Sequence, residues 1–204
     1  MRTATLLLAV IFLSVTLRAQ NAANYILEIN GDTVSLALDG TKTFKNSKGQ
    51  TYTLKLKQKE VLHYEDAKFS FQYPANYTVS SEKIDDDITQ LLCFAATGDG
   101  FLIQSYKDIN PENMVDLMLE EMTKESVDAG YKETITTVQH TLGSGKVLTG
   151  KRSTLTLDDD TSAYEIYPVK SGKGGLLIVH IILDSEDEKA AAAKETFWKT
   201  IKLK

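Results

Sequence analysis

The chain has 204 residues, of which 28 are acidic and 23 basic, so its formal net charge at pH 7 is −5. This acidic balance disfavours nucleic acid as a ligand, because binding to a phosphate backbone relies on clustered lysine and arginine. The single cysteine, Cys93, cannot form a disulfide within the chain, so the fold must be stabilised by its hydrophobic core.

The N-terminal segment has the layout of a cleavable secretory signal. Arg2 is followed by the apolar run from Leu6 to Leu13 and then by small residues that end at Ala19. The apolar run is well short of the ~20 residues that a membrane-spanning helix needs, and no later segment is long enough. We therefore expect residues 1–19 to be removed, leaving an exported protein, periplasmic or secreted, that does not span a membrane. The alternative is a leader retained as a membrane anchor.

Charge is distributed unevenly along the rest of the chain. Residues 20–62 carry six lysines and four acidic residues, whereas residues 63–204 carry 15 basic and 24 acidic residues. This change in character predicts two units, a small β module over residues 20–62 and a larger domain over residues 63–204.

Two hairpins are predicted in the β module. The pair Asn30-Gly31 lies between two apolar-rich segments, and both residues tolerate the positive φ that a two-residue turn requires. A second turn is expected at residues 46–49. The returning strand would then point Tyr52, Leu54 and Leu56 to one face.

The same returning strand carries Lys55, Lys57 and Lys59 at every second position, which places them on the other face. A charged row of this kind is typical of a solvated edge that discourages strand-to-strand aggregation. It is also our candidate for a partner surface, which would bind an acidic protein, a polysaccharide or a lipid headgroup.

The segment FSFQYP, residues 69–74, alternates aromatic and polar side chains. In a strand Phe69, Phe71 and Tyr73 point to one face, and Pro74 ends the strand because it lacks an amide donor. Such a row can be a stacking platform for a ligand or part of a core. We favour the core, since aromatic residues frequently anchor half-buried strands.

A hairpin and a helix follow in the larger domain. Two strands over residues 88–106 are joined by the turn Gly98-Asp99-Gly100. The helix should begin after Asn110, with Pro111 in its first turn, and end at Gly130. Its apolar residues recur at helical spacing and are Met114, Val115, Met118, Leu119 and Met122.

A four-stranded meander and a second helix complete the predicted domain. The last strand, LLIVHIIL, is apolar at seven of eight positions, which predicts a central strand covered on both faces. Ser185 and Glu188 fit a capping box for the helix. The four strands are expected at residues 133–142, 146–157, 162–170 and 176–183, and the buried stripe of the helix at Ala190, Ala193, Phe197 and Ile201.

Together these elements predict an α+β fold, an antiparallel β-sheet with helices packed on it, preceded by the small β-hairpin module. FSFQYPANYTV, INPENMVDLMLEEM and the closing LLIVHIILDSEDEKAAAAKETFWKTIKLK resemble the PsbP-like α/β/α sandwich family, over residues 66–204. The leader, which ends in Ala-Gln-Asn, resembles those of exported Bacteroidetes proteins. The resemblance implies binding to other proteins, and no metal or partner residue of the family can be assigned in this sequence.

The sequence contains no catalytic spacing. His63, His140 and His180 lie far apart, none belongs to an HExxH zinc motif, and no GxSxG elbow is present. We expect His180 to be a neutral, hydrogen-bonded core residue and Cys93, within LLCFAA, to be a buried inert thiol.

Two further patterns come close to binding motifs. GKVLTGKR, residues 145–152, has the glycine spacing of a phosphate-binding loop, but Arg152 stands where that loop needs serine or threonine. The acidic runs 85–87 and 158–160 could hold Ca²⁺, but they lack the glycine and the distal glutamate of an EF-hand loop. Solvated turns are the favoured interpretation of both runs.

We therefore predict an exported, non-catalytic binding or accessory protein of the cell envelope that engages an envelope or secreted protein partner and uses no cofactor or metal. The alternative is a small-ligand or metal-binding protein. A third alternative is a hydrolase whose serine, histidine and acid meet only in three dimensions.

Overall fold

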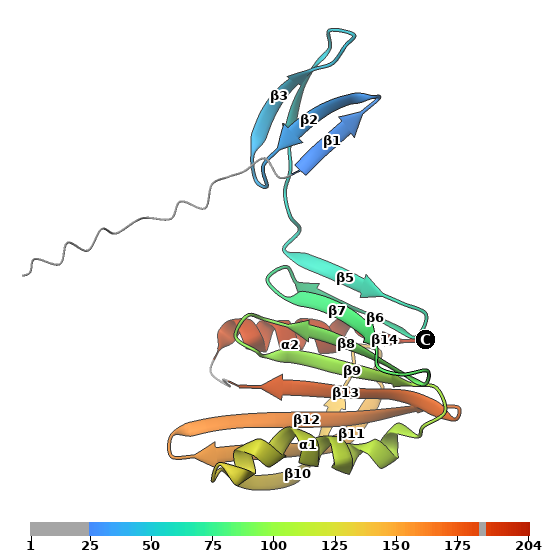
Figure 1. Cartoon of the computed structure of the whole chain (residues 1–204), viewed down its shortest axis with the longest axis vertical. Helices are drawn as coiled ribbons and strands as arrows, with labels where there is room; N and C mark the ends of the chain where they lie inside the picture. Colours follow the sequence, from blue (N-terminus) through green and yellow to red (C-terminus); the bar gives the residue numbers. More distant parts are fainter. Residues whose placement is uncertain (1–24, 184–186) are drawn as a thin grey trace, which may run out of the picture. The chain divides into compact units, whose positions relative to one another are not determined.

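The computed structural model describes residues 25–183 and 187–204, which divide into two compact units (Figure 1). The first unit extends to Gln58 and the second begins at Lys59. The sequence placed this boundary after residue 62, which lies within the first strand of the second unit. The predicted signal segment, residues 1–19, lies outside the described residues.

The first unit consists of two antiparallel hairpins, as predicted. Asn30 and Gly31, with φ of 51° and 88°, form the turn of the first hairpin, and Gly49, with φ of 80°, lies in the turn of the second. The positive φ values confirm the turn chemistry read from Asn30-Gly31. The strands are β1 (Tyr25–Ile29), β2 (Asp32–Leu36), β3 (Thr41–Lys45) and β4 (Thr51–Lys55).

The expectation that Lys55, Lys57 and Lys59 share one strand is wrong. Strand β4 ends at Lys55, because its partner β3 begins at Thr41, the residue paired with Lys55. The backbone N–H of Asp39 donates to the carbonyl oxygen of Leu56 instead. Residues 56–59 form no helix or strand, and Lys59 belongs to the second unit.

The second unit is built on a seven-stranded antiparallel sheet in the order β10-β11-β12-β13-β9-β8-β7. Its strands are β7 (Thr78–Lys83), β8 (Ile88–Phe94), β9 (Gly100–Tyr106), β10 (Lys132–Thr141), β11 (Val147–Leu157), β12 (Asp160–Ser171) and β13 (Gly174–Ile182). Strand β13 therefore lies at the centre of the sheet, as its apolar sequence predicted. A smaller sheet, β14-β6-β5, contains β5 (Val61–Glu65), β6 (Phe69–Pro74) and β14 (Lys202–Leu203).

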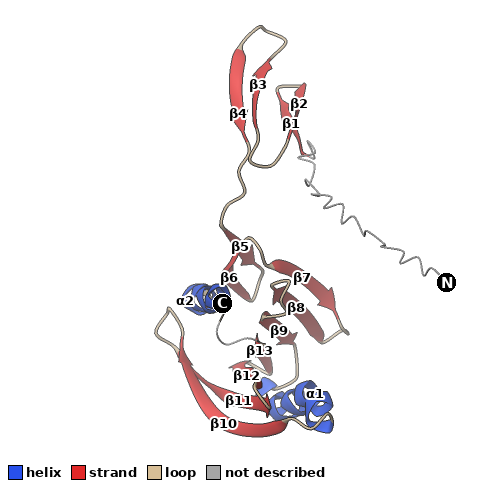
Figure 2. Cartoon of the chain, turned by 90° about the vertical axis from the view of Figure 1, so that its left-hand side faces the viewer, coloured by secondary structure: helices blue, strands red, loops and turns tan. Residues whose placement is uncertain are grey.

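Two helices cover opposite faces of the large sheet (Figure 2). Helix α1 (Val115–Asp128) packs on the face that includes Leu177 and Val179. Helix α2 (Glu188–Thr200) and the small sheet pack on the face that includes Leu176 and Ile178. Successive residues of β13 thus serve two cores, which confirms the α+β fold with helices on an antiparallel sheet.

The aromatic row of FSFQYP belongs to the core. Phe69 and Phe71 are buried, and the Phe71 ring lies 5.0 Å from that of Phe197 on α2. Tyr73 packs against the same cluster while partly exposed. The row confirms the core interpretation, although β6 joins the small sheet and is not the first strand of the second unit.

The helix boundaries follow their caps. Asn110 accepts a hydrogen bond from the N–H of Glu112, and a 3₁₀ turn, η1 (Pro111–Met114), precedes α1. Gly130, with φ of 100°, follows α1, as predicted. The N-cap of α2 is Asp187, which accepts from the N–H of Lys189. The predicted cap Ser185 lies outside the described residues.

Candidate functional site

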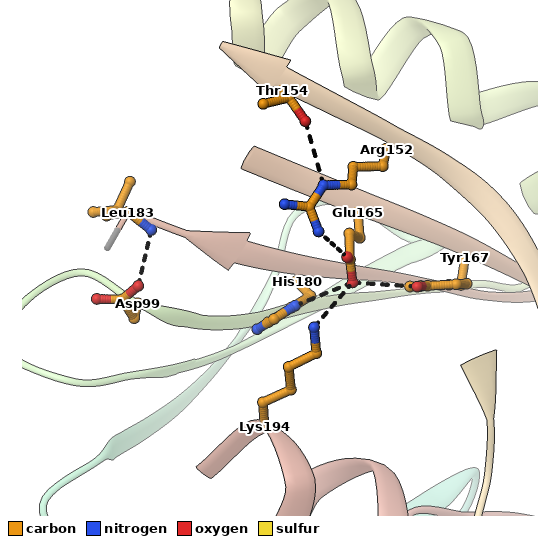
Figure 3. Close-up of polar contacts among 8 residues, drawn as sticks. All are labelled: Asp99, Arg152, Thr154, Glu165, Tyr167, His180, Leu183 and Lys194. Carbon is orange, nitrogen blue, oxygen red and sulfur yellow. Dashed lines mark hydrogen bonds and ion pairs between the residues drawn. The ribbon is translucent and has the colours of Figure 1, made fainter. Parts of the chain in front are cut away.

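A row of polar residues crosses the face of the large sheet that α2 covers. The strand register places Arg152 on β11 opposite Glu165 on β12, and Glu165 opposite His180 on β13. Helix α2, at the bottom of Figure 3, adds Lys194, which points toward Glu165. Side chains from β11, β13 and α2 therefore meet around the Glu165 carboxylate of β12.

The Glu165 carboxylate is surrounded by donors. Its Oε1 lies 2.7 Å from Nη1 of Arg152, and its Oε2 lies 3.3 Å from Nδ1 of His180 and 3.2 Å from the Tyr167 hydroxyl. The Nζ of Lys194 is 3.7 Å from Oε2. Because a buried charge is costly unless it is paired and hydrogen-bonded, these contacts explain how an acid is tolerated here.

The environment sets the protonation of this pair. Burial by itself raises the pKa of Glu165, but the hydrogen bond with His180 and the positive charges of Lys194 and Arg152 outweigh it and lower the pKa to about 2. Burial lowers the pKa of His180 from its usual value. Both shifts favour an ionised Glu165 that accepts a hydrogen bond from a neutral His180. The buried, hydrogen-bonded position predicted for His180 is confirmed, and its neutral state stays a prediction.

The contacts of this cluster are hydrogen bonds and ion pairs among its own side chains. A cavity of about 170 Å³ is lined by Arg152, His180 and Lys194, but no serine, threonine or cysteine side chain is bonded to His180 among the described residues. The carboxylate is already engaged by four donors. A nucleophile and base in hydrogen-bonding contact, which acyl transfer would need, are not found in this cluster.

The other predicted reactive residues are dispersed. His63 is exposed beside Glu65, with Nε2 and Oε2 3.3 Å apart, and His140 lies over Trp198 with ring centres 4.4 Å apart. The Cys93 thiol is 1% exposed, and burial raises its pKa to about 12. This confirms the buried position predicted from LLCFAA, and the inertness of the thiol stays a prediction.

The segments that come close to binding motifs form ordinary strands and turns. Gly150 of GKVLTGKR lies within β11, where a Cβ atom would be 2.1 Å from the carbonyl oxygen of Ile166. Asp85 accepts from the N–H groups of Asp87 and Ile88 in the turn before β8. In the described part of the chain, no three His, Cys, Asp or Glu side chains are grouped so that they could hold a metal ion.

A lysine-lined pocket of about 360 Å³ lies where several strands of the second unit end. Tyr106, Val169, Leu176 and Leu203 supply its apolar lining. Its five lysines come from the start of β6, the end of β9, the turn before β11, the end of β12 and the C-terminal segment: Lys68, Lys107, Lys146, Lys170 and Lys204.

Three of these five lysines have no acidic partner in the described part of the chain. Lys204 pairs with Glu65 at 2.8 Å, and Lys107 lies 3.8 Å from Asp87. Lys68, Lys146 and Lys170 form no ion pair with a described residue, and all three are exposed. The pocket therefore combines apolar surface with excess positive charge, which is the chemistry that receives an anionic group.

Sequence reasoning missed both groupings. A charged residue at an inward position of SAYEIYPVK, beside Ala163 and Tyr167, was the available signal for Glu165. For the lysine-lined pocket the signal was absent, because the lysines are scattered from residue 68 to residue 204 and meet only through the folded sheet.

The predicted partner-surface residues Lys55, Lys57 and Lys59 are exposed and form no ion pair with a described residue. Their role stays a prediction. Within residues 25–183 and 187–204, no helix combines the length and hydrophobicity that a membrane crossing requires.

Comparison of the chain with models of protein families and with curated proteins found no match. The resemblance to the PsbP-like family thus stays a prediction.

Proposed function

We propose that this protein is an exported, non-catalytic binding or accessory protein of the cell envelope, which receives an acidic group of a protein partner in the lysine-lined pocket. The observation that carries the proposal is the gathering of five lysines at one pocket of a chain whose net charge is −5. A cleft lined by charges of one sign raises the local concentration of oppositely charged ligands.

The pocket would recognise a partner in two ways. Lys68, Lys146 and Lys170 can donate charge-assisted hydrogen bonds, which are roughly twice as strong as neutral ones. The apolar residues Leu176 and Leu203 can contact a neighbouring apolar side chain of the partner. Exposed lysines also attract an acidic partner before contact, so association should weaken as salt rises.

The non-catalytic part of the proposal is supported by the two groups that chemistry would need most. The Glu165 carboxylate is occupied by donors from Arg152, His180 and Tyr167. The Cys93 thiol is buried and protonated at neutral pH, since its pKa is about 12. Neither group is free to attack or deprotonate a substrate.

Capture in intact cells tests the proposal. The protein is crosslinked to its neighbours, and recovered proteins are compared between the native chain and the triple variant Lys68→Gln, Lys146→Gln, Lys170→Gln. The control carries the same charge change at exposed lysines elsewhere: Lys45→Gln, Lys48→Gln, Lys189→Gln. We expect the pocket variant to lose at least ~90% of a captured partner while the control keeps it, consistent with loss of several charge-assisted bonds.

A small anionic ligand is the second candidate, because about 360 Å³ lies within the size range of small-molecule pockets. Thermal unfolding in the presence of citrate, pyrophosphate and decanoate distinguishes a small anionic ligand from a protein partner. A rise in melting temperature that the pocket variant abolishes favours the small ligand. Equal capture by the native chain and both triple variants, or no reproducible capture at all, contradicts the partner proposal.

A further inference from the structure

The open edge of β10 is a second feature that could bind a partner, and it is distinct from the lysine-lined pocket. β10 is the terminal strand of the seven-stranded sheet and is ten residues long, and among the described residues it pairs only with β11 (Figures 1 and 2). A strand with one free edge presents backbone donors and acceptors to any extended chain that approaches.

The register shows which residues face that edge. In the turn after β10, the N–H of Leu142 donates to the carbonyl oxygen of Lys146, so the backbone groups of Leu142 point toward β11. In an antiparallel pair, successive residues point their backbone groups alternately toward and away from the partner strand. The odd-numbered residues from Glu133 to Thr141 therefore direct their N–H and C=O groups outward. None of these groups forms a backbone hydrogen bond with a described residue.

The edge also lacks the usual protection. Residues 134–141 of β10 carry no charge at neutral pH, since burial lowers the pKa of His140. Exposed edges are commonly blocked by short length, charges or proline. The opposite edge strand, β7, has six residues and ends in Glu82 and Lys83. β10 is thus the edge that is able to accept another strand.

An acidic groove runs beside this edge. α1 and β10 line a space of about 420 Å³, in which Ile135 and Val127 contribute apolar surface. Glu133 and Ile135 both belong to the outward-facing set, so the groove borders the open backbone. Four acids and one lysine line it, namely Asp116, Glu120, Asp128, Glu133 and Lys124, and Asp116 is already paired with Lys151.

The charge of α1 distinguishes two possible occupants of the edge, a second copy of β10 and a strand of another protein. Antiparallel pairing of two β10 strands about a two-fold axis would place both α1 helices on the same side of the joined sheet. Each α1 carries five acidic residues and one lysine, so the two helices would repel. An incoming strand with positive side chains toward α1 meets the groove with complementary charge instead.

We propose that β10 binds an extended segment of a partner protein by strand addition, and that this segment carries lysine or arginine at every second position on the side facing α1. The backbone edge supplies the hydrogen bonds and the acidic groove selects the sequence.

The probe for this proposal is a fluorescein-labelled heptapeptide, KTKTKTK, titrated with the full chain and followed by fluorescence anisotropy. Two further forms carry backbone N-methyl groups, one on the lysines and one on the threonines. In a bound strand alternate N–H groups face one neighbour, so one methylated form should bind like the parent peptide and the other at least tenfold more weakly. The peptide ETETETE is the charge control and should bind at least tenfold more weakly.

Three variants locate the site. Thr137→Pro removes an outward N–H without removing a bond to β11, and Glu120→Lys reverses a charge in the groove; each should weaken binding at least tenfold. Glu121→Lys makes the same charge change on α1 outside the groove lining and should leave binding within twofold. Glu120→Lys keeps the test decisive if Thr137→Pro fails to fold.

Two results would overturn the proposal. One is equal binding of both methylated peptides, or of KTKTKTK and ETETETE. The other is a concentration-dependent dimer in sedimentation that Thr137→Pro dissociates, because that identifies a second copy of the chain as the occupant. Both readouts are independent of the lysine-lined pocket.

Discussion

The Glu165 carboxylate lies beside the His180 imidazole beneath α2, with Oε2 3.3 Å from Nδ1 and side chains only 6% and 7% exposed. This contact connects the neighbouring strands β12 and β13 through two buried side chains. It remains favourable because Arg152 and Lys194 neutralise the carboxylate. Stability should therefore depend on this acid more than on any surface acid.

Replacement of Glu165 by glutamine should destabilise the protein by about 3 kcal/mol, since it leaves Arg152 and Lys194 close together without their counter-charge. The free energy of unfolding from urea denaturation measures the loss. The matched control is Glu195→Gln on α2, whose exposed ion pair with Lys199 should contribute little. Similar losses in both variants would contradict a structural role for the buried cluster.

Stability should fall as the pH falls from neutral, in two stages. The pKa of His180 is lower in the folded protein than its usual 6.5, so the unfolded chain takes up this proton first and stability declines below about pH 6.5. The pKa of Glu165 falls from 4.5 to about 2 on folding, which adds a second decline below about pH 4.5. The urea midpoints of unfolding at pH 7.5, 5.5 and 3.5 measure the two declines in stability. The variant Glu165→Gln should lose most of the decline below about pH 4.5. A midpoint constant over this range would rule out the assigned protonation states.

Gly150 should be required by packing. Its Cβ position lies 2.1 Å from the carbonyl oxygen of Ile166 and 2.8 Å from the Tyr167 ring, so Gly150→Ala forces strands β11 and β12 apart. We expect a loss of about 3 kcal/mol in the free energy of unfolding. Gly145→Ala, in the preceding turn, meets no atom within 4 Å and changes only a residue with φ of 84°, which should cost about 1 kcal/mol. If the two variants lose the same stability, the close approach at Gly150 is not the reason for this glycine.

Cys93 should be unreactive in the folded protein. Its burial and its pKa of about 12 leave almost no accessible thiolate at pH 8. Labelling with an aromatic disulfide reagent should be at least ~1,000-fold slower in buffer than in concentrated urea, because a domain stable by ~5 kcal/mol is unfolded in less than one molecule per thousand. Rapid labelling of the native protein would contradict the buried position.

Local elements were predictable where a residue has a strong conformational preference. Asn30-Gly31 identified the first turn, Asn110 and Gly130 bounded the first helix, and the apolar run of β13 identified a central strand. Strands β5, β7 and β14 were missed. The segments VLHYE and TVSSEK are largely exposed, and β14 has only two residues, so none carries a strong apolar alternation.

The amino-acid order by itself determined the turns, caps and inward-facing apolar positions, because these depend on backbone preferences and on periodicity within a few residues. Which strands become neighbours was decided only by the tertiary structure, since pairing joins residues far apart in the chain and the register sets what lies opposite. That register places Glu165 between Arg152 and His180. Where the strands end, Lys68 and Lys170 come together in the lysine-lined pocket. The physical reason is that long-range burial of apolar side chains aligns the strands, and the charged residues take the positions that this alignment leaves to them.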